Sequence, residues 1–247
     1  MKPSIRIGIV TLAGMGTLRA AYPLVVDDAA IHPPGEREID VTVDVRRDPA
    51  THAAGNSFSF TTGICSRIEG SVGLGFGWQR ERDSATPNER EGLLDLSLGL
   101  KTPLVDSSRC PFALSLSSTA TLPTASHGLG VGATNFNFLL IATREWGRVS
   151  FDGNAGFNWV PESGRDNKSE EAGFFGAALR WQTTEKWMLF VETYMLLPDH
   201  DGADLQSFLR CGCQAEVTRG VYIGGAFEAG CKGTEEAAIS LGLTLIF

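Results

Sequence analysis

The sequence predicts an all-β protein: a closed, antiparallel transmembrane β-barrel of about 12 strands that follows a cleaved signal peptide. Three observations indicate this fold. Apolar and polar residues alternate with a period of two over long stretches, tight turns alternate with longer polar connections, and all five tryptophans lie near the ends of predicted strands. A period of two is that of a β-strand, in which successive side chains point to opposite faces.

Composition excludes several other classes of protein. The chain of 247 residues is 43% hydrophobic and has a mean hydropathy of −0.02, which is typical of neither disordered chains nor helical membrane proteins. After the N-terminus no run of 18 apolar residues occurs, so ordinary transmembrane helices are excluded. The abundance of glycine, 29 residues, together with the short apolar alternations favours an all-β fold.

Residues 1–21 have the pattern of an export signal peptide. Lys2 and Arg6 precede an apolar stretch over 7–18, and Ala20-Ala21 offers small residues for cleavage. A buried N-terminal helix is the alternative interpretation. Removing residues 1–21 takes away three basic residues and no acidic one, so the formal charge moves from −8 to −11. An acidic mature protein argues against nucleic acid as a partner.

Four stretches show the alternation most clearly, and in each of them charged, hydroxyl-bearing or small residues mostly occupy the positions between the apolar ones. The apolar positions are Ile39, Val41, Val43 and Val45; Ile68, Val72, Leu74, Phe76 and Trp78; Leu94, Leu96, Leu98 and Leu100; and Ile239, Leu241, Leu243, Leu245 and Phe247.

Weaker versions of the pattern complete a set of strands of about nine to fourteen residues, long enough to cross a membrane at a tilt. Their ranges are 36–47, 56–65, 68–80, 91–102, 111–120, 133–144, 147–160, 171–182, 186–197, 205–217, 220–230 and 236–247. Short periplasmic turns opposite longer outer loops explain the alternating connections. Because lipid cannot satisfy an open sheet edge, we expect the barrel domain, 36–247, to pair its first strand with its last, with both ends at the periplasmic side.

Alternation alone does not say which face meets lipid, because a soluble barrel shows the same pattern inverted. The tryptophans favour lipid outside, since an indole with one wet edge prefers the membrane interface. Trp78 and Trp159 are expected at outer strand ends, and Trp146, Trp181 and Trp187 at inner ends. The terminal Phe247 resembles the signal that outer-membrane barrels present to the barrel assembly machinery. We therefore expect a location in the outer membrane, in contact with its lipid.

Two segments carry a resemblance to a known family. The first is Tyr22-Pro23-Leu24-Val25-Val26-Asp27-Asp28, followed by Pro33-Pro34-Gly35-Glu36; the second is Leu122-Pro123-Thr124, followed by Gly128-Leu129-Gly130-Val131-Gly132. They resemble the Asp-Asp box and the glycine loop of an outer-membrane family described as transporters of the meta-pathway of phenol degradation. Ala125 stands where that family usually has glycine. The resemblance implies the barrel fold and a transport role, and it brings no binding residues.

The face expected to point inward carries many ionisable residues, which are polar lumen-lining candidates. They are Glu38, Asp40, Asp44, Arg46, Glu69, Asp95, Lys101, Asp152, Arg180, Glu192, Arg210, Glu216 and Glu228. They could line a polar path, in which the excess of acids would favour cations. They could equally form a salt-bridged filling of a narrow barrel, and the sequence leaves both interpretations open.

Residues 22–35 precede the first predicted strand and include Asp27, Asp28 and His32. The two aspartates are plug or gate candidates, because this segment could fold into the lumen. Alternatively, it is a tail that crosses the periplasmic opening. A hydrophobic substrate would need apolar residues in the lumen, for which Leu139, Ile141 and Phe174 are candidates.

Other chemistry receives little support from the sequence. The five cysteines form no metal or redox motif, although Cys65 and Cys110 could be bridged. The acidic stretch 199–204 spaces its oxygen ligands somewhat like a calcium loop but lacks the distal glutamate, so a solvated loop is favoured. His200 within it is the one suggestive catalytic histidine. We expect no enzymatic activity, no cofactor and no metal.

The sequence-based hypothesis is therefore an outer-membrane channel for passive uptake of small solutes, including aromatic and other hydrophobic molecules. A structural or surface-interaction barrel without transport is the alternative, followed by a barrel hydrolase.

Overall fold

A computed structural model describes residues 23–81, 88–106, 110–130, 132–160, 170–197, 205–234 and 236–247. The predicted signal peptide and the acidic stretch around His200 lie outside the described residues. Within the described ranges, no helix is long and apolar enough to cross a membrane.

The described residues form thirteen β-strands. They are β1 (Arg37–Arg47), β2 (Thr51–Cys65), β3 (Ile68–Glu81), β4 (Glu89–Leu93), β5 (Leu96–Val105), β6 (Ala113–Leu122), β7 (Asn135–Trp146), β8 (Val149–Val160), β9 (Glu170–Gln182), β10 (Trp187–Leu197), β11 (Gln206–Thr218), β12 (Val221–Lys232) and β13 (Ala237–Ile246). Both β4 and β5 pair with β3, so they are two halves of one interrupted strand.

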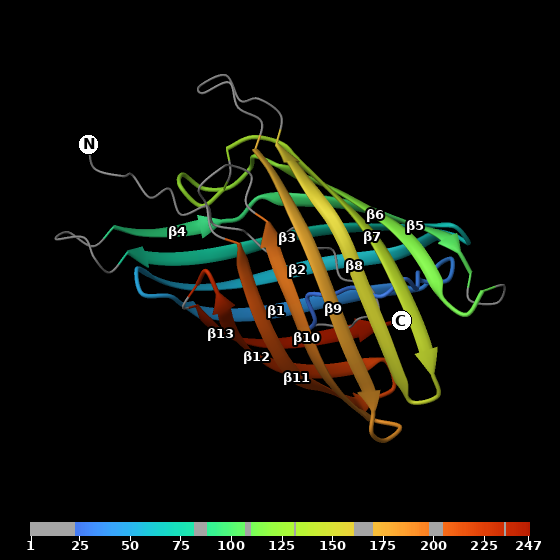
Figure 1. Ribbon diagram of the computed structural model, residues 1–247. Helices are drawn as coiled ribbons and strands as arrows, with labels where there is room; N and C mark the ends of the chain where they lie inside the picture. The colour runs from blue at the N-terminus through green and yellow to red at the C-terminus, as the bar shows by residue number, and fades with distance from the viewer. Residues whose placement is uncertain are drawn as a thin grey trace.

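The strands form one closed antiparallel sheet (Figure 1). Sequential neighbours pair around the ring, β2 pairs with both β1 and β3, and β1 pairs with β13 from Glu38↔Ile246 to Arg47↔Ala237. Counting β4 and β5 as one, the ring has twelve members, which confirms the predicted barrel and its closure by the first and last strands. Closure leaves no open edge to be satisfied in lipid.

The two ends of the barrel differ in their connections. Turns of two residues join β2 to β3, β7 to β8 and β11 to β12, at 66–67, 147–148 and 219–220. The start of β1 lies at the same end, because the backbone of Arg37 exchanges hydrogen bonds with that of Phe247. We call this end the turn end and the opposite one the loop end; the predicted alternation of connections is correct for these turns.

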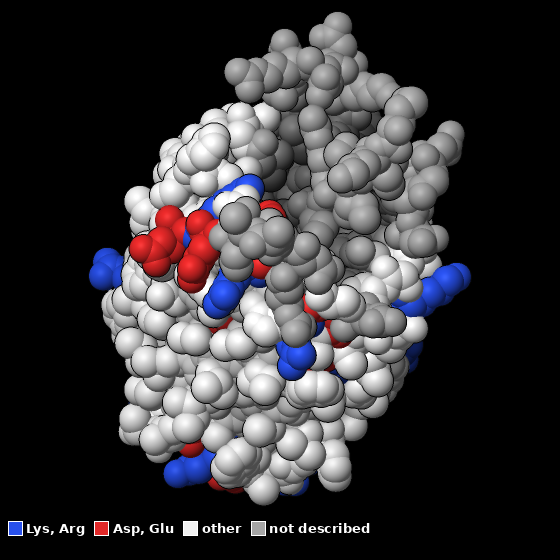
Figure 2. Space-filling model, turned by 90° about the vertical axis from the view of Figure 1, so that its left-hand side faces the viewer, with Lys and Arg blue, Asp and Glu red and all other residues white. Residues whose placement is uncertain are grey.

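The apolar face of the strands points outward. Val41, Val43 and Val45 in β1 are exposed, whereas Glu38 and Asp40 on the opposite face are buried, and Leu241 in β13 is 60% exposed. Figure 2, which looks at the molecule from one side, shows a broad area without charged residues between charges in the middle and charges at the lower edge. A protein that exposes leucine and valine while burying glutamate and aspartate needs an apolar solvent around it.

The prediction for the start of β2 was wrong. The strand begins at Thr51 rather than at 56, so its connection to β1 is a tight turn. The carboxylate of Asp48 accepts hydrogen bonds from the backbone of Ala50 (2.7 Å) and of Thr51 (2.7 Å) and thereby closes the turn. The early part of β2, residues 51–55, contains Ala53, Ala54 and Gly55 and shows no alternation of apolar and polar residues, so the sequence pattern did not indicate a strand there.

A second error concerns Leu94, which was expected on the outward face. A β-bulge separates β4 from β5: Phe76 pairs with Leu93 while Gly73 pairs with Ser97, which leaves one extra residue on the β4–β5 side. The bulge turns Leu94 inward, over Gly75 and Gly77; a Cβ on Gly77 would lie 2.9 Å from the Leu94 side chain. The two glycines therefore make room for this leucine.

Candidate functional site in the barrel interior

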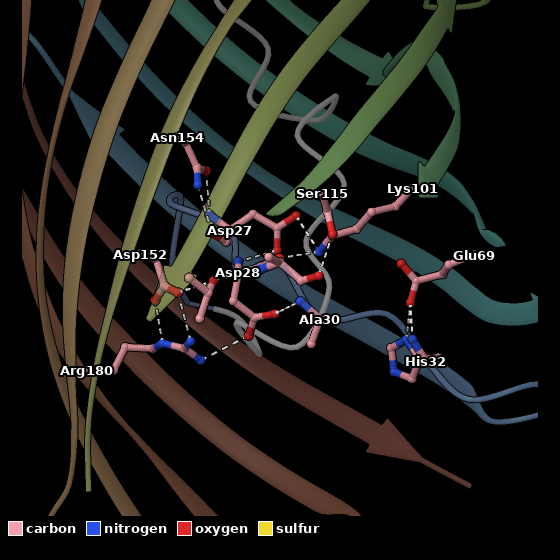
Figure 3. Close-up of polar contacts among 12 residues, drawn as sticks. Asp27, Asp28, Ala30, His32, Glu69, Lys101, Ser115, Asp152, Asn154 and Arg180 are labelled. Carbon is pink, nitrogen blue, oxygen red and sulfur yellow. Dashed lines mark hydrogen bonds and ion pairs between the residues drawn. The ribbon is translucent and has the colours of Figure 1, made fainter. Parts of the chain in front are cut away.

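Residues 23–34 are here called the N-terminal segment; as far as His32 they are buried or half-buried and lie inside the ring of strands (Figure 3). At the turn end Pro34 forms a β-bridge with Gly63 of β2, and the segment enters β1 through Gly35, whose φ of 85° is readily adopted only by glycine. Gly63 is also required, because a Cβ there would lie 2.1 Å from the carbonyl oxygen of Pro33. These two glycines fix where the segment leaves the barrel wall.

The two plug candidates, Asp27 and Asp28, are buried and paired with bases on opposite parts of the wall. Lys101 of β5 lies 3.1 Å from Asp27 (Nζ to Oδ2), and Arg180 of β9 lies 3.0 Å from Asp28 (Nη1 to Oδ2). Arg180 also holds Asp152 of β8 through two hydrogen bonds, Nε to Oδ2 at 2.7 Å and Nη2 to Oδ1 at 3.0 Å. Opposite charges thus join the segment directly to β5 and β9, and Arg180 links it onward to β8.

The backbone of the segment bonds to side chains of the wall, since it has few other partners. Glu192 of β10 accepts hydrogen bonds from the N–H groups of Val25 (2.9 Å) and Val26 (2.8 Å). Asn154 of β8 both accepts from and donates to the backbone of Asp27, at 2.7 and 2.8 Å. The backbone of Ala29 likewise receives hydrogen bonds from, and donates them to, hydroxyl groups of the wall.

His32 anchors the segment near the turn end. Its Nδ1 lies 2.5 Å from Oε2 of Glu69 in β3, and its Nε2 lies 3.4 Å from Oε2 of Glu38 in β1. Burial lowers the pKa of His32, but hydrogen bonds and charge from Glu38 and Glu69 outweigh it and raise the pKa from 6.5 to about 9. The imidazolium form is therefore the bound form at neutral pH.

This arrangement predicts that the segment loosens at alkaline pH. A group whose pKa is higher in the folded state gives stability that is fully present below pH 6.5 and is lost as the pH rises through about 9. The contribution at neutral pH is about 2–3 kcal/mol, and it should disappear between pH 7 and 10 in unfolding titrations. His32→Gln should flatten that pH dependence; equal slopes for the variant and the wild type would contradict the assignment.

A second ionic network lies toward the loop end. Arg210 of β11 lies 3.0 Å from Glu228 of β12 (Nη1 to Oε2) and 3.5 Å from Glu192 (Nε to Oε1). Tyr194 donates its hydroxyl to Glu228 at 2.7 Å. Arg46 of β1 joins the same network through Glu228 and Glu236. The buried charges of β10–β12 thus compensate one another and, through Glu192, reach the segment.

The other inward candidates bond to hydroxyl groups or lie at the barrel end. Asp40 accepts from Ser59 at 3.2 Å, and Asp44 accepts from Ser240 at 2.5 Å. Glu216 is half-buried near the turn end of β11, where its N–H bonds to the Lys186 carbonyl. All thirteen polar candidates therefore lie on the inward side, and most of them are engaged with one another or with the segment.

Asp95 has a partner that the sequence did not suggest. Its Oδ1 accepts the N–H of Ala125 at 2.8 Å, and Ser126 exchanges hydrogen bonds with the backbone of Leu93. Leu129, in the same loop after β6, is buried. The second family-like segment is thus a loop folded against the inner wall at the bulge. Its glycines were a visible signal: a Cβ on Gly130 would lie 2.5 Å from Asp95.

One side of the interior is apolar. Leu139, Ile141 and Phe174 are buried there, as their inward position in the sequence suggested, and they pack with Val25 and Ala29 of the segment. The rings of Tyr194 and Phe208 stack at 4.8 Å, with Phe174 next to Tyr194 at 6.0 Å. Tyr194 and Phe208 share the inward face of Glu192 and Arg210, so the parity of the strands could have revealed them.

The predicted interface aromatics lie on the outer surface near strand ends. Trp146, Trp181, Trp187 and Phe247 are exposed at the turn end, and Trp159 is exposed at the loop end. Trp78 is half-buried and donates its Nε1 hydrogen to Glu89 at 2.6 Å. The five cysteines are all free, so the alternative of a bridge between Cys65 and Cys110 is not realised.

Comparison with known proteins bears on the fold. A family model described as the MetA-pathway of phenol degradation matches residues 35–228. The translocator domain of the autotransporter NalP from Neisseria meningitidis is 11% identical, with a TM-score of 0.60 over 89% of this chain and 91% of that one. The NanC porin is 11% identical, with a TM-score of 0.60 over 84% of this chain and 98% of that one. The KdgM porin is 5% identical, with a TM-score of 0.56 over 84% of this chain and 99% of that one.

Comparison with curated proteins gave no match. The likenesses to solved structures concern the fold, because the identities are low. Together with the family match they confirm the predicted outer-membrane β-barrel.

Proposed function

Because the chain belongs to the family described as the MetA-pathway of phenol degradation, we propose that it is an outer-membrane channel for passive entry of small solutes, including aromatic and other hydrophobic ones. We further propose that the N-terminal segment is its displaceable plug. The observation that carries the proposal is the two-sided interior, in which the segment covers a buried aromatic and aliphatic surface opposite a polar one.

The contacts of the N-terminal segment are of a kind that would let it move out of the barrel interior. Apart from the bridge at Pro34, the segment is held mainly by side chains of the wall, and each of these groups can be hydrated when the segment moves away. The sheet that forms the barrel is closed without the segment, so leaving does not require strands to separate. The turn end, where the segment meets the wall, would face the periplasm.

The proposed cargo follows from what the segment covers. Val25 and Ala29 lie against the ring stack of Phe174, Tyr194 and Phe208, so a solute with an aromatic or aliphatic part could take their place. The opposite wall offers hydroxyl groups, among them Ser59 and Thr42, to a polar substituent. The excess of acids among the inward residues would disfavour anions.

Vesicle swelling tests the proposal. Phenylalanine and alanine are suitable probes because both are zwitterions that cross lipid slowly and differ by a ring. Vesicles with the full chain should swell slowly in either solute. Vesicles with a variant that lacks residues 23–32 should swell much faster. Their swelling rate in phenylalanine, compared with that in alanine, should be higher than the larger size of phenylalanine alone predicts. Both proteins need to be shown folded first, by the altered gel mobility of unheated barrels.

The channel proposal would be overturned if both proteins, with and without residues 23–32, are folded and neither makes vesicles swell faster than protein-free vesicles do. That result would favour the alternative, a structural or surface-interaction barrel. The extensive ion pairing of the interior is the observation on its side.

A further inference from the structure

The outer, lipid-facing wall has a hollow of about 500 Å³ over β2, β3, β5, β6 and β7. We call it the wall groove. Its lining is almost entirely apolar and includes Phe60, Gly70, Val72, Leu98, Ala120 and Phe136. The volume lies in the range of sites that bind small molecules.

The groove exists because small residues replace the large apolar ones that cover the rest of the wall. Gly70 of β3 and Ser118 and Ala120 of β6 point outward there and form its floor. Aromatic rings form one side, and they are held in place: Phe136 stacks on Trp159 at 5.7 Å, and Phe138 lies 5.2 Å from Phe157. The rings on this side are therefore held by their neighbours, while the exposed side chain of Ile64 borders the floor at Gly70.

The groove is closed toward the interior. The pairing of β3 with β5 runs without a gap from Glu69↔Lys101 to Gly73↔Ser97, directly beneath it. The pairing of β5 with β6 continues across the same region, from Leu96↔Leu122 to Pro103↔Ser115. The occupant of the groove must therefore come from the bilayer. The continuous strand pairing leaves no lateral opening here through which a solute could pass from the barrel interior.

A positive charge lies at one end of the groove. Arg67 is exposed in the turn between β2 and β3, three residues from Ile64 and three from Gly70, both of which line the groove. At the rise of a strand this places its backbone about 10 Å from them. Lipid phosphates lie at the level where the strands end, and basic side chains at that level attract them.

We propose that the wall groove binds one acyl chain of a phospholipid in the periplasmic leaflet, with the phosphate received by Arg67. An acyl chain matches an apolar hollow that opens to the membrane and is closed toward the interior, and the anionic head group matches the basic turn. The proposal is independent of transport.

Native mass spectrometry tests it, with dipalmitoyl phosphatidylethanolamine added to the refolded protein in detergent. The wild type should keep one lipid after the detergent is stripped. Ala120→Leu fills the groove and should weaken retention about tenfold. Ala155→Leu is the matched control, because Ala155 also faces outward, in β8, but lies outside the groove. Its retention should equal that of the wild type.

Arg67→Gln tests the head group, by comparing the phospholipid with dipalmitoylglycerol, which has the same chains and no phosphate. The variant should lose affinity for the phospholipid alone. Equal retention by Ala120→Leu and Ala155→Leu, or a dimer in place of a bound lipid, would overturn the acyl-chain site. Equal losses of both lipids in Arg67→Gln would overturn the phosphate contact.

Discussion

Replacing Arg180 with methionine is expected to lower the free energy of unfolding by about 3–5 kcal/mol. Asp152 is fully buried and pairs with Arg180, which also pairs with Asp28 of the segment. Methionine fills similar space but leaves two carboxylates without their counter-charge. Removing one partner of such a pair destabilises the folded state, because the remaining charge stays buried without a counter-charge.

Urea unfolding of the protein in phospholipid vesicles, followed by tryptophan fluorescence, measures this loss. Arg148→Met is the matched control, because Arg148 lies in an exposed turn and, among the described residues, its guanidinium donates to the backbone carbonyl of Thr183 at 3.3 Å. Its change should stay within about 0.5 kcal/mol. Adding Asp152→Asn to Arg180→Met should recover part of the loss. If both arginine variants unfold alike, the buried network does not contribute as argued.

The contacts of this network bear on two interpretations that the sequence left open. The inward ionisable residues could line a hydrated path or fill the barrel as salt bridges. Lys101, Arg180 and Arg210 each contact at least one buried acid, and the first two contact the segment itself. The interior is therefore filled in the described state, and any path for solutes requires a rearrangement of the segment.

The fold could be predicted because each strand shows it locally, as an alternation of apolar and polar residues. A strand that faces lipid on one side and a polar interior on the other must alternate, so β1 and β13 were visible from valine, leucine and their neighbours. The pattern fails where a local event breaks its period. Leu94 lies at a bulge that shifts the parity of β4 relative to β5, and the start of β2 has no alternation of apolar and polar residues.

The course of the N-terminal segment could not be read in the same way. Its contacts are with residues distant in sequence: Asp27 bonds Lys101, 74 positions away, and Asp28 bonds Arg180, 152 positions away. No periodicity constrains a segment that lacks a strand partner. The paired aspartates indicated that the segment was special, but their partners depend on how the ring of strands brings β5, β8 and β9 together.

A disulfide that ties the segment to the wall should reduce solute entry to the level of protein-free vesicles. Ser115 of β6 donates its hydroxyl to the carbonyl of Ala29, so these two residues lie in contact and are the positions at which the cysteines are placed. The five native cysteines are free and would first be replaced with serine or alanine. Entry should be lost on oxidation and restored by dithiothreitol, because only the reduced protein can move its segment.

The comparison separates a displaceable plug from a fixed constriction. Each single-cysteine variant, oxidised in the same way, should behave like the reduced protein, since it cannot form the tie. If the oxidised double variant passes phenylalanine as fast as the reduced one, solutes travel along the hydroxyl-bearing wall beside a stationary segment. The ring stack of Tyr194 and Phe208 would then stay covered during transport and could not select the cargo.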